Sequence, residues 1–178
     1  RSAHANAYFT GLGSSKRVVF FDTLLSKLDT DEVEAVLAHE LGHFHHRHII
    51  KRMVLMFGLS LAGFALLGWL YNQVWFYTGL GVMPNLMSPN AALALILFLL
   101  VVPQFVFFLS PLLASLSRRD EYQADAYAVQ QTAAKPLATA LLKLYEDNAS
   151  TLTPDPVYVK FYYSHPPASS RLARMGMA

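Results

Sequence analysis

The chain has 178 residues, enough for one compact domain, but only 15% of them are charged, against about 25% in an ordinary soluble domain. A net charge of +2 gives no sign of a nucleic-acid binder, and 54% of the residues are apolar. The chain has no cysteine, which excludes a disulfide scaffold, a thiolate zinc site and a cysteine nucleophile.

The first residues predict a small β-hairpin. Asn6–Leu12 and Arg17–Leu24 have the pattern of two short strands, and the segment between them is rich in glycine and serine. Arg1–Ser15 is polar and contains no secretory signal, and the chain does not begin with methionine. We therefore expect this chain to be a piece of a longer protein, cut upstream.

A helix is expected next. Asp29 or Thr30 can cap its first turn, and the acidic residues that follow suit the positive end of the helix dipole. Apolar residues then recur at helical spacing: Val33, Val36, Leu37 and Leu41. No proline or turn signal intervenes before Gly58, so we expect this helix to run straight on into an apolar segment.

The middle of the chain is uncharged. The 65 residues from Met53 to Ser117 contain no Asp, Glu, Lys, Arg or His. A helix needs roughly 20 apolar residues to cross a bilayer, so we predict spanning helices at about 53–77 and 91–115, with a turn around Pro84 between them. The alternative is a pair of buried core helices in a large soluble protein, although such helices seldom run this long without a charge.

Two more helices are expected after the apolar segments, over Arg118–Gln131 and Pro136–Glu146. From Asn148 onward the chain is rich in proline and has the pattern of a loop. The chain contains no internal repeat and no low-complexity tract.

His39-Glu40-Leu41-Gly42-His43 is an H-E-x-x-H motif on the helix predicted after Asp29. A spacing of four puts both imidazoles on one helix face, where they can bind the same metal ion. Glu40, beside the first of them, can then serve as general base toward a water molecule. The alternative is a histidine-rich surface helix, because three further histidines follow. We expect these three to be interfacial or structural, with His46 on the face of His43: His45, His46 and His48.

Glu121 is the predicted third ligand. A zinc peptidase site needs three protein ligands and an open position for water. Glu121 follows the second apolar segment, and a helical hairpin in the membrane would return it to the side of His39 and His43. Asp125 lies one turn further on the same face, where it can accept a hydrogen bond from a ligand histidine. The alternative is a solvated helix face whose acidic residues pair with neighbouring arginines.

Four motifs carry a resemblance to a known family: His4-Ala5-Asn6-Ala7-Tyr8, Val36-Leu37-Ala38-His39-Glu40-Leu41-Gly42-His43, Ser117-Arg118-Arg119-Asp120-Glu121-Tyr122-Gln123-Ala124-Asp125 and Ser164-His165-Pro166-Pro167. They resemble the membrane gluzincins, which include the type 1 CAAX prenyl endopeptidases and the bacterial heat-shock membrane peptidases. The first and third motifs are closer to the prenyl-endopeptidase branch. The resemblance implies a mainly α fold with a zincin-like catalytic core, a small β-hairpin and a transmembrane helical hairpin, all in one metallopeptidase region of residues 1–178. It also implies further spanning helices upstream of this chain.

The resemblance gives roles to three residues that the pattern alone leaves open. Asn6 would lie on an edge strand to which a substrate backbone adds as a further strand. His165 would donate a hydrogen bond to the oxyanion of the reaction. Arg171 would pair with Asp125 or Glu121 and hold the helix of the third ligand in place. Without the resemblance, these residues would be read as a turn residue, a loop residue and a solvated tail charge.

The expected function is that of a membrane endopeptidase that uses Zn²⁺ to hydrolyse peptide bonds. Its expected partners are a peptide or lipidated-peptide substrate, membrane lipid and upstream helices of the same protein, with no nucleic acid. Prenyl-protein (CAAX) processing and membrane-protein quality control both stay open. A non-catalytic zinc-binding membrane protein would not need Glu40, and a metal transporter would be expected to carry ionisable groups inside the membrane.

The charges around the apolar segments predict their orientation. Arg47, Lys51 and Arg52 precede the first segment, Arg118 and Arg119 follow the second, and the loop between the segments has no charge. Because cytoplasmic flanks of spanning helices are enriched in lysine and arginine, we expect a multi-pass membrane protein whose active site faces the cytoplasm.

Overall fold

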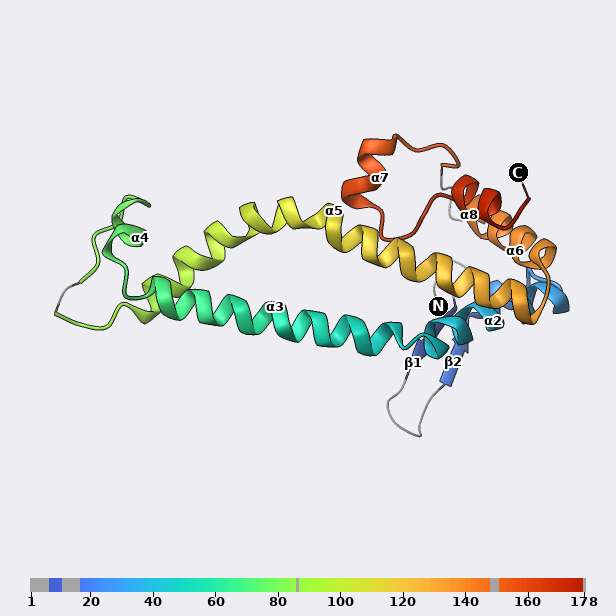
Figure 1. The fold of residues 1–178 in the computed structure, drawn as a ribbon, viewed down its shortest axis with the longest axis horizontal. Coiled ribbons are helices and arrows are strands. Elements are labelled where there is room, and N and C mark those ends of the chain that lie inside the picture. The colour runs from blue at the N-terminus through green and yellow to red at the C-terminus, as the bar shows by residue number, and fades with distance from the viewer. Residues whose placement is uncertain (1–6, 11–16, 86, 148–150, 178) are drawn as a thin grey trace. The chain divides into compact units, whose positions relative to one another are not determined.

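The structure is a computed structural model that describes residues 7–10, 17–85, 87–147 and 151–177. It is mainly helical, as predicted, and the described residues contain one two-stranded sheet (Figure 1). The chain forms two compact units. We call residues 1–49 with 111–178 the polar unit, and residues 50–110 the apolar unit.

The sheet of the polar unit is a short antiparallel pair. Strand β1 (Ala7–Thr10) pairs with β2 (Arg17–Phe20), so that Ala7 lies opposite Phe20 and Thr10 opposite Arg17. Strand β2 is shorter than predicted, whereas residues 6, 11 and 12 of the first predicted strand lie outside the described residues. The end of the second predicted strand instead forms helix α1 (Asp22–Leu25), whose first turn is acidic, as a helix N-terminus favours. Strand β1 lies beside helix α2 (Thr30–His45).

Helix α2 begins where its capping residues predict. The carboxylate of Asp29 accepts a hydrogen bond from the amide of Glu32, and Glu32 accepts one from the amide of Asp29, each at 2.9 Å. Lys143 of helix α6 (Ala134–Asp147) donates to Glu32 at 2.6 Å. Small side chains of α2 pack against α5 (Ala91–Gln131) and α6 in one buried cluster: Ala35, Ala38, Ala128 and Leu137.

Helix α2 ends at His45 and does not continue into the apolar segment, so that expectation was wrong. The amide of His46 still donates to Gly42, and the amide of Arg47 to Phe44, each at 3.0 Å. Arg47 then adopts a φ of 55°, a left-handed conformation that ends the helix. Helix α3 (His48–Leu70) starts directly after this turn, which places His48 on the polar side of the break.

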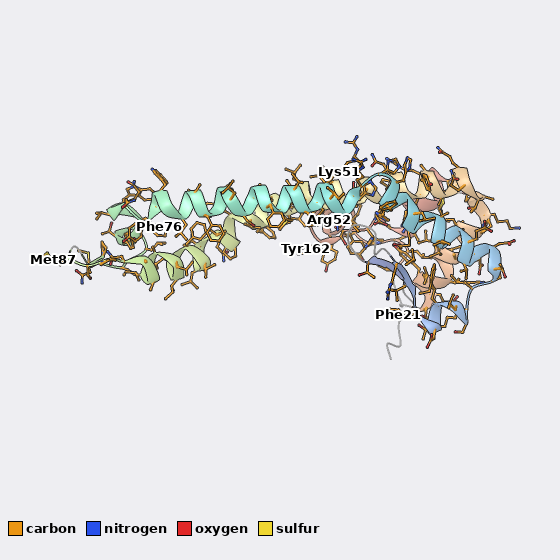
Figure 2. The ribbon with its side chains drawn as sticks, turned by 90° about the horizontal axis from the view of Figure 1, so that it is seen from below. Phe21, Lys51, Arg52, Phe76, Met87 and Tyr162 are labelled. Carbon is orange, nitrogen blue, oxygen red and sulfur yellow. The ribbon has the colours of Figure 1, made fainter. Side chains whose placement is uncertain are left out.

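The apolar unit consists of most of α3, helix α4 (Val74–Thr78) and the first part of α5. The first spanning helix was predicted to reach residue 77, but α3 ends at Leu70. The side chains of Asn72 and Gln73 donate back to the carbonyls of Gly68 and Trp69 and so satisfy the end of the helix. A buried cluster joins the end of α3, helix α4 and the start of α5: Leu70, Phe76, Tyr77, Ala94 and Leu97. Figure 2 labels Phe76 in this cluster and Met87 in the connecting turn.

Helices α3 and α5 are both long and apolar enough to cross a membrane. Large side chains along them are open to the surroundings: Phe57 is 70% exposed, Phe64 70% and Phe108 73%. Contiguous apolar surface of this kind is rare on a soluble protein and is typical of contact with lipid. At 41 residues, α5 is about 60 Å long, twice the thickness of a bilayer core. Its polar part from Arg118 onward therefore extends beyond the apolar span.

The second half of the chain differs from the prediction in two ways. Residues 118–131 are not a separate helix, because α5 continues without a break to Gln131. The tail is not a loop, because it contains helix α7 (Pro156–Tyr162) and helix α8 (Ala168–Arg174). Asp155 caps α7 by accepting hydrogen bonds from the amides of Val157 and Tyr158, each at 2.9 Å.

Candidate metal centre

A close contact between α2 and the polar part of α5 sets the geometry of the site. Gly42 is buried, and a β-carbon placed on it would lie 2.9 Å from the Cα atom of Ala124 and 3.0 Å from its carbonyl oxygen. Real β-carbons essentially never come so close, so only glycine allows these two backbones to pass at this distance. Gly42 lies beside His43 in the motif, and Ala124 lies one turn after Glu121.

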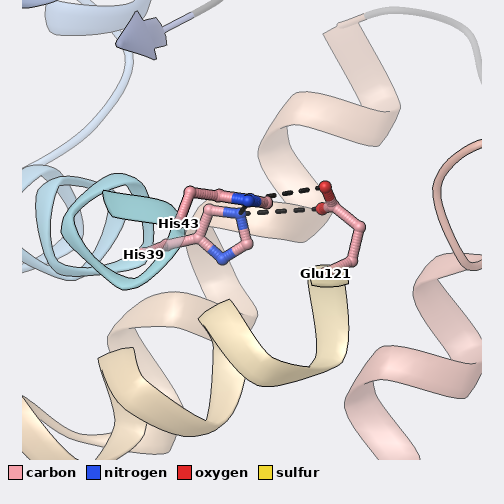
Figure 3. Close-up of side chains that lie close together, drawn as sticks. All are labelled: His39, His43 and Glu121. Atoms are coloured by element: carbon pink, nitrogen blue, oxygen red, sulfur yellow. Dashed lines mark hydrogen bonds and ion pairs between the residues drawn. The ribbon is translucent and has the colours of Figure 1, made fainter. Parts of the chain in front are cut away.

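The contact brings three side chains together (Figure 3). The Nε2 atoms of His39 and His43 are 3.2 Å apart. One carboxylate oxygen of Glu121 lies 3.6 Å from Nε2 of His39, and the other lies 3.4 Å from Nε2 of His43. These residues are the only group of three or more His, Cys, Asp or Glu in the described part of the chain whose ligand atoms converge on one point.

The donor set and its spacing fit a zinc ion. Imidazole nitrogens and a carboxylate oxygen are ordinary zinc ligands, with bonds of about 2.1 Å. In a tetrahedral site, two ligand atoms at that bond length are about 3.4 Å apart. The separations of 3.2, 3.4 and 3.6 Å bracket this value. Three protein ligands leave a fourth position for water or substrate, as in catalytic zinc sites.

A buried ion pair between Asp125 and Arg171 supports the ring of His39 at its Nδ1 atom. This Nδ1 atom lies 2.9 Å from a carboxylate oxygen of Asp125. Arg171 of α8 binds the same carboxylate through two nitrogens, at 2.7 and 2.5 Å, and its third nitrogen lies 3.7 Å from Glu121. Burial lowers the pKa of His39 below its ordinary value, although the hydrogen bond with Asp125 acts to raise it. The lowered pKa favours the neutral imidazole that a metal ion requires. Asp125 and Arg171 thus lie where the sequence analysis expects supporting residues.

Glu40 is half-buried beside the ligand cluster, and its carboxyl is easily protonated. Burial raises the pKa of Glu40 to about 7, and the negative charge of Glu121 contributes to this rise. The positive charges of His43 and Arg171 act in the opposite direction but are outweighed. A carboxyl whose pKa lies near neutrality can both take up and release a proton at physiological pH, as general acid–base catalysis requires.

His165 reaches the cluster from the loop between α7 and α8. Its Nδ1 atom lies 3.4 Å from the Glu121 oxygen that faces His43, and 62% of its side chain is exposed. Arg118 of α5 fixes the start of this loop by donating hydrogen bonds to the carbonyls of Val159 and Tyr163, at 3.0 and 2.8 Å. His165 therefore presents an exposed ring at the open side of the cluster.

Glu121, in the polar part of α5, is held ionised by its surroundings. Burial alone would raise its pKa, but the hydrogen bond with His43 and the positive charges of His165, His39 and Arg171 lower the pKa of Glu121 to about 2. An ionised carboxylate is the form that coordinates a metal ion.

The structure brings seven of the eight predicted site residues into one place; the eighth, Asn6, lies outside the described residues. Six of the seven have their side chains in direct polar contact with another member of the group: His39, His43, Glu121, Asp125, His165 and Arg171. Glu40 interacts electrostatically with three members of the group, since the charges of His43, Glu121 and Arg171 all affect its pKa. Sequence reasoning expected His48 to be interfacial or structural but did not foresee its contact with His43, against which it is buried. The ring of His46, which was expected on the face of His43, stacks on His48.

Residues 1–177 match the sequence profile of Peptidase family M48. CAAX prenyl protease 1 of Saccharomyces cerevisiae is 37% identical over 187 residues, which cover 98% of this chain and 41% of the relative. The CAAX prenyl protease 1 homolog of Arabidopsis thaliana is 38% identical over 177 residues, which cover 97% of this chain and 40% of the relative.

The fold has a solved counterpart. A crystal structure of S. mikatae Ste24p superposes with a TM-score of 0.86 at 35% identity, over 98% of this chain and 43% of that chain. This chain therefore spans about two fifths of the length of the curated relatives that it matches. Two apolar helices and this likeness identify a membrane protein with a mainly helical fold. Because the match to the family covers nearly every residue, the chain belongs to Peptidase family M48.

Proposed function

We propose that this chain is the catalytic region of a zinc-dependent membrane endopeptidase that processes prenylated (CAAX) proteins. The observation that carries the proposal is the spacing of the three ligand atoms, at 3.2, 3.4 and 3.6 Å, with the carboxyl of Glu40 beside them. His39, His43 and Glu121 would hold the ion. When bound, zinc supplies Lewis-acid chemistry, which polarises a carbonyl group and lowers the pKa of a coordinated water.

The protein's own residues would transfer the proton, stabilise the developing charge, position the ligands and bind the substrate. Glu40, a half-buried carboxyl beside the ligand cluster, accepts a proton from the attacking water and later delivers it to the leaving amine. The exposed ring of His165 donates a hydrogen bond to the oxygen on which negative charge develops. Asp125, locked by Arg171, keeps the ring of His39 in place. Strand β1, beside α2, offers an edge along which an extended substrate can lie, and Asn6 directly precedes this strand in the sequence.

The printed names of the relatives support the choice of substrate. The proteins from Saccharomyces cerevisiae and Arabidopsis thaliana are named CAAX prenyl protease 1 and its homolog. A substrate with a lipid tail also suits a site whose third ligand lies on the same helix as an apolar span. We extend the proposal to the whole protein, in which further spanning helices accompany this chain and the active site faces the cytoplasm, as the flanking arginines and lysines favour.

The test compares two peptides that differ only in a farnesyl group on the CAAX cysteine. Full-length protein in lipid vesicles should cleave the farnesylated peptide, a zinc chelator should abolish cleavage, and added zinc should restore it. Equal cleavage of both peptides would replace prenyl processing by general peptide hydrolysis. Cleavage of neither peptide by zinc-loaded protein would refute the proposed function.

Glu40→Gln is the matched control for this experiment. The amide keeps the shape of the side chain but cannot take a proton from water, so turnover should fall by about 100- to 10,000-fold. Because Glu40 is not a ligand, the variant should keep its zinc. Wild-type turnover in Glu40→Gln would remove Glu40 from the mechanism.

A further inference from the structure

His48 is a buried histidine that the proposed reaction does not use. It is the first residue of α3, directly after the left-handed turn at Arg47, and only 2% of its surface is exposed. Its Nδ1 atom lies 3.0 Å from Nδ1 of His43. On the other side of the ring, its Nε2 atom lies 3.0 Å from the amide oxygen of Gln123 and 3.5 Å from a carboxylate oxygen of Asp120.

These contacts define the direction of the hydrogen bonds. Nε2 of His43 faces His39 and Glu121, so its lone pair must be free there if it is to bind a metal ion. The proton of neutral His43 is then on Nδ1, which donates to Nδ1 of His48. His48 in turn carries its proton on Nε2, where the oxygens of Gln123 and Asp120 can accept it.

The reverse direction is incompatible with metal binding. If Nδ1 of His48 carried a proton, it would have to donate to Nδ1 of His43. The proton of His43 would then move to Nε2, the atom that faces the other two ligands, and His43 could not coordinate. One arrangement alone therefore satisfies the hydrogen bonds and leaves the ligand atom free.

We propose that His48 is a positioning residue that fixes the tautomer and ring orientation of the ligand His43. The hydrogen bonds from His43 to His48 and from His48 to Gln123 form a chain that we call the relay. Gln123 lies on α5 together with the third ligand, Glu121. It thus ties the α2 ligand to the helix of the α5 ligand. The two ligand histidines are supported by different chemistry, since His39 is held by the carboxylate of Asp125 and His43 by a neutral imidazole.

The inference rests on the proposed zinc site, and it is tested by metal binding. Asn and Leu have nearly the same shape, but only Asn offers an oxygen that can accept the proton of His43. In full-length protein, His48→Leu should weaken zinc affinity by about 10- to 100-fold in a competition with a chelator. His48→Asn should retain most of the affinity. In cobalt-substituted protein, the visible absorption bands should shift in His48→Leu and stay near those of the wild type in His48→Asn.

The control is His45→Leu. His45 lies on the same helix as His43, but its ring stacks on Tyr127, with the ring centroids 4.9 Å apart. It should bind zinc like the wild type. Equal affinity and an unchanged spectrum in His48→Leu would overturn the relay, and so would equal losses in His48→Leu and His48→Asn, which would indicate a packing role only. Failure of the wild type to bind zinc would instead refute the proposed function. Should His48→Leu not fold, His48→Phe provides a ring without nitrogen for the same comparison.

Discussion

Gly42 and Ala124 touch backbone to backbone, and this contact determines how near Glu121 comes to the two histidines. A β-carbon on Gly42 would lie 2.9 Å from the Cα atom of Ala124 and 3.2 Å from the β-carbon of Tyr127. Helices α2 and α5 are both continuous through this contact, and Ala124 is fully buried. Gly42, the second x position of the H-E-x-x-H motif, is therefore part of the helix packing that forms the candidate metal site.

Gly42→Ala should separate the two helices. In an open helix the change would stabilise the protein by about 1 kcal/mol, but here the added carbon meets backbone, and such overpacking costs about 1–3 kcal/mol. We expect a lower melting temperature and weaker zinc binding, measured by thermal unfolding and chelator competition. Gly63→Ala on α3, where an added β-carbon meets no atom within 4 Å, is the matched control. A Gly42→Ala protein that melts higher and keeps its zinc affinity would contradict this interpretation.

The Glu32–Lys143 pair should make stability depend on pH. Burial alone would raise the pKa of Glu32, but the hydrogen bond from Lys143 and those from Asp29 and Thr139 lower it below its ordinary value of 4.5. A carboxyl whose pKa is lower in the folded than in the unfolded state stabilises the fold above about pH 4.5, and this stability is lost as the pH falls through the folded pKa.

Glu32→Gln tests this dependence. It keeps a capping side chain at the start of α2 but removes the charge, so it should cost about 1 kcal/mol at neutral pH, a modest value because Lys143 is partly exposed to solvent. The difference in unfolding free energy from the wild type should shrink below pH 4.5. A difference that stays constant between pH 7 and pH 3 would show that the charge of Glu32 contributes nothing.

His165→Ala should reduce kcat and leave the metal in place. The ring of His165 reaches Glu121 at 3.4 Å but does not belong to the group of ligand atoms. Loss of one hydrogen-bond donor to a developing oxyanion typically lowers kcat by about 100-fold. Steady-state kinetics and zinc analysis on the same preparation separate the two effects. A preparation with normal kcat would exclude His165 from the reaction, and one without zinc would make His165 a metal ligand.

The orientation of the apolar helices can be read with single cysteines, because the chain has none of its own. Met87, in the turn between the apolar helices, is 95% exposed, and Thr151 is exposed in the polar unit. An impermeant thiol reagent added to intact cells should label Met87→Cys and spare Thr151→Cys until the cells are opened. Labelling in the opposite pattern would place the metal site outside the cytoplasm.

Much of the fold follows from local signals. Asp29 and Glu32 mark the start of α2, the four-residue spacing of His39 and His43 fixes a common face, and the uncharged stretch predicts two long apolar helices. The proximity of Glu121 to both histidines was expected because two apolar helices of similar length return the chain to the side from which it left.

The remaining features depend on contacts between distant residues. Helix α7 has seven residues, too few to form a stable helix alone. It is stabilised by Arg118, which donates hydrogen bonds to the carbonyls of Val159 and Tyr163, 41 and 45 positions away in the sequence. The Asp155-Pro156 cap was visible in the sequence and would have located its start. The role of His48 follows from the left-handed turn at Arg47, which no periodicity signals, since arginine seldom adopts that conformation.

Zinc analysis of purified Glu121→Ala protein beside the wild type tests the central claim most directly, because Glu121 is the proposed ligand that the motif does not contain. The side chain supplies one of three donor atoms that lie within 4.8 Å of one another, so its removal should leave two ligands and a weak site. We predict close to one zinc ion per wild-type chain and almost none in Glu121→Ala after brief dialysis against a chelator. Full zinc occupancy in Glu121→Ala under the same dialysis would contradict the three-ligand site.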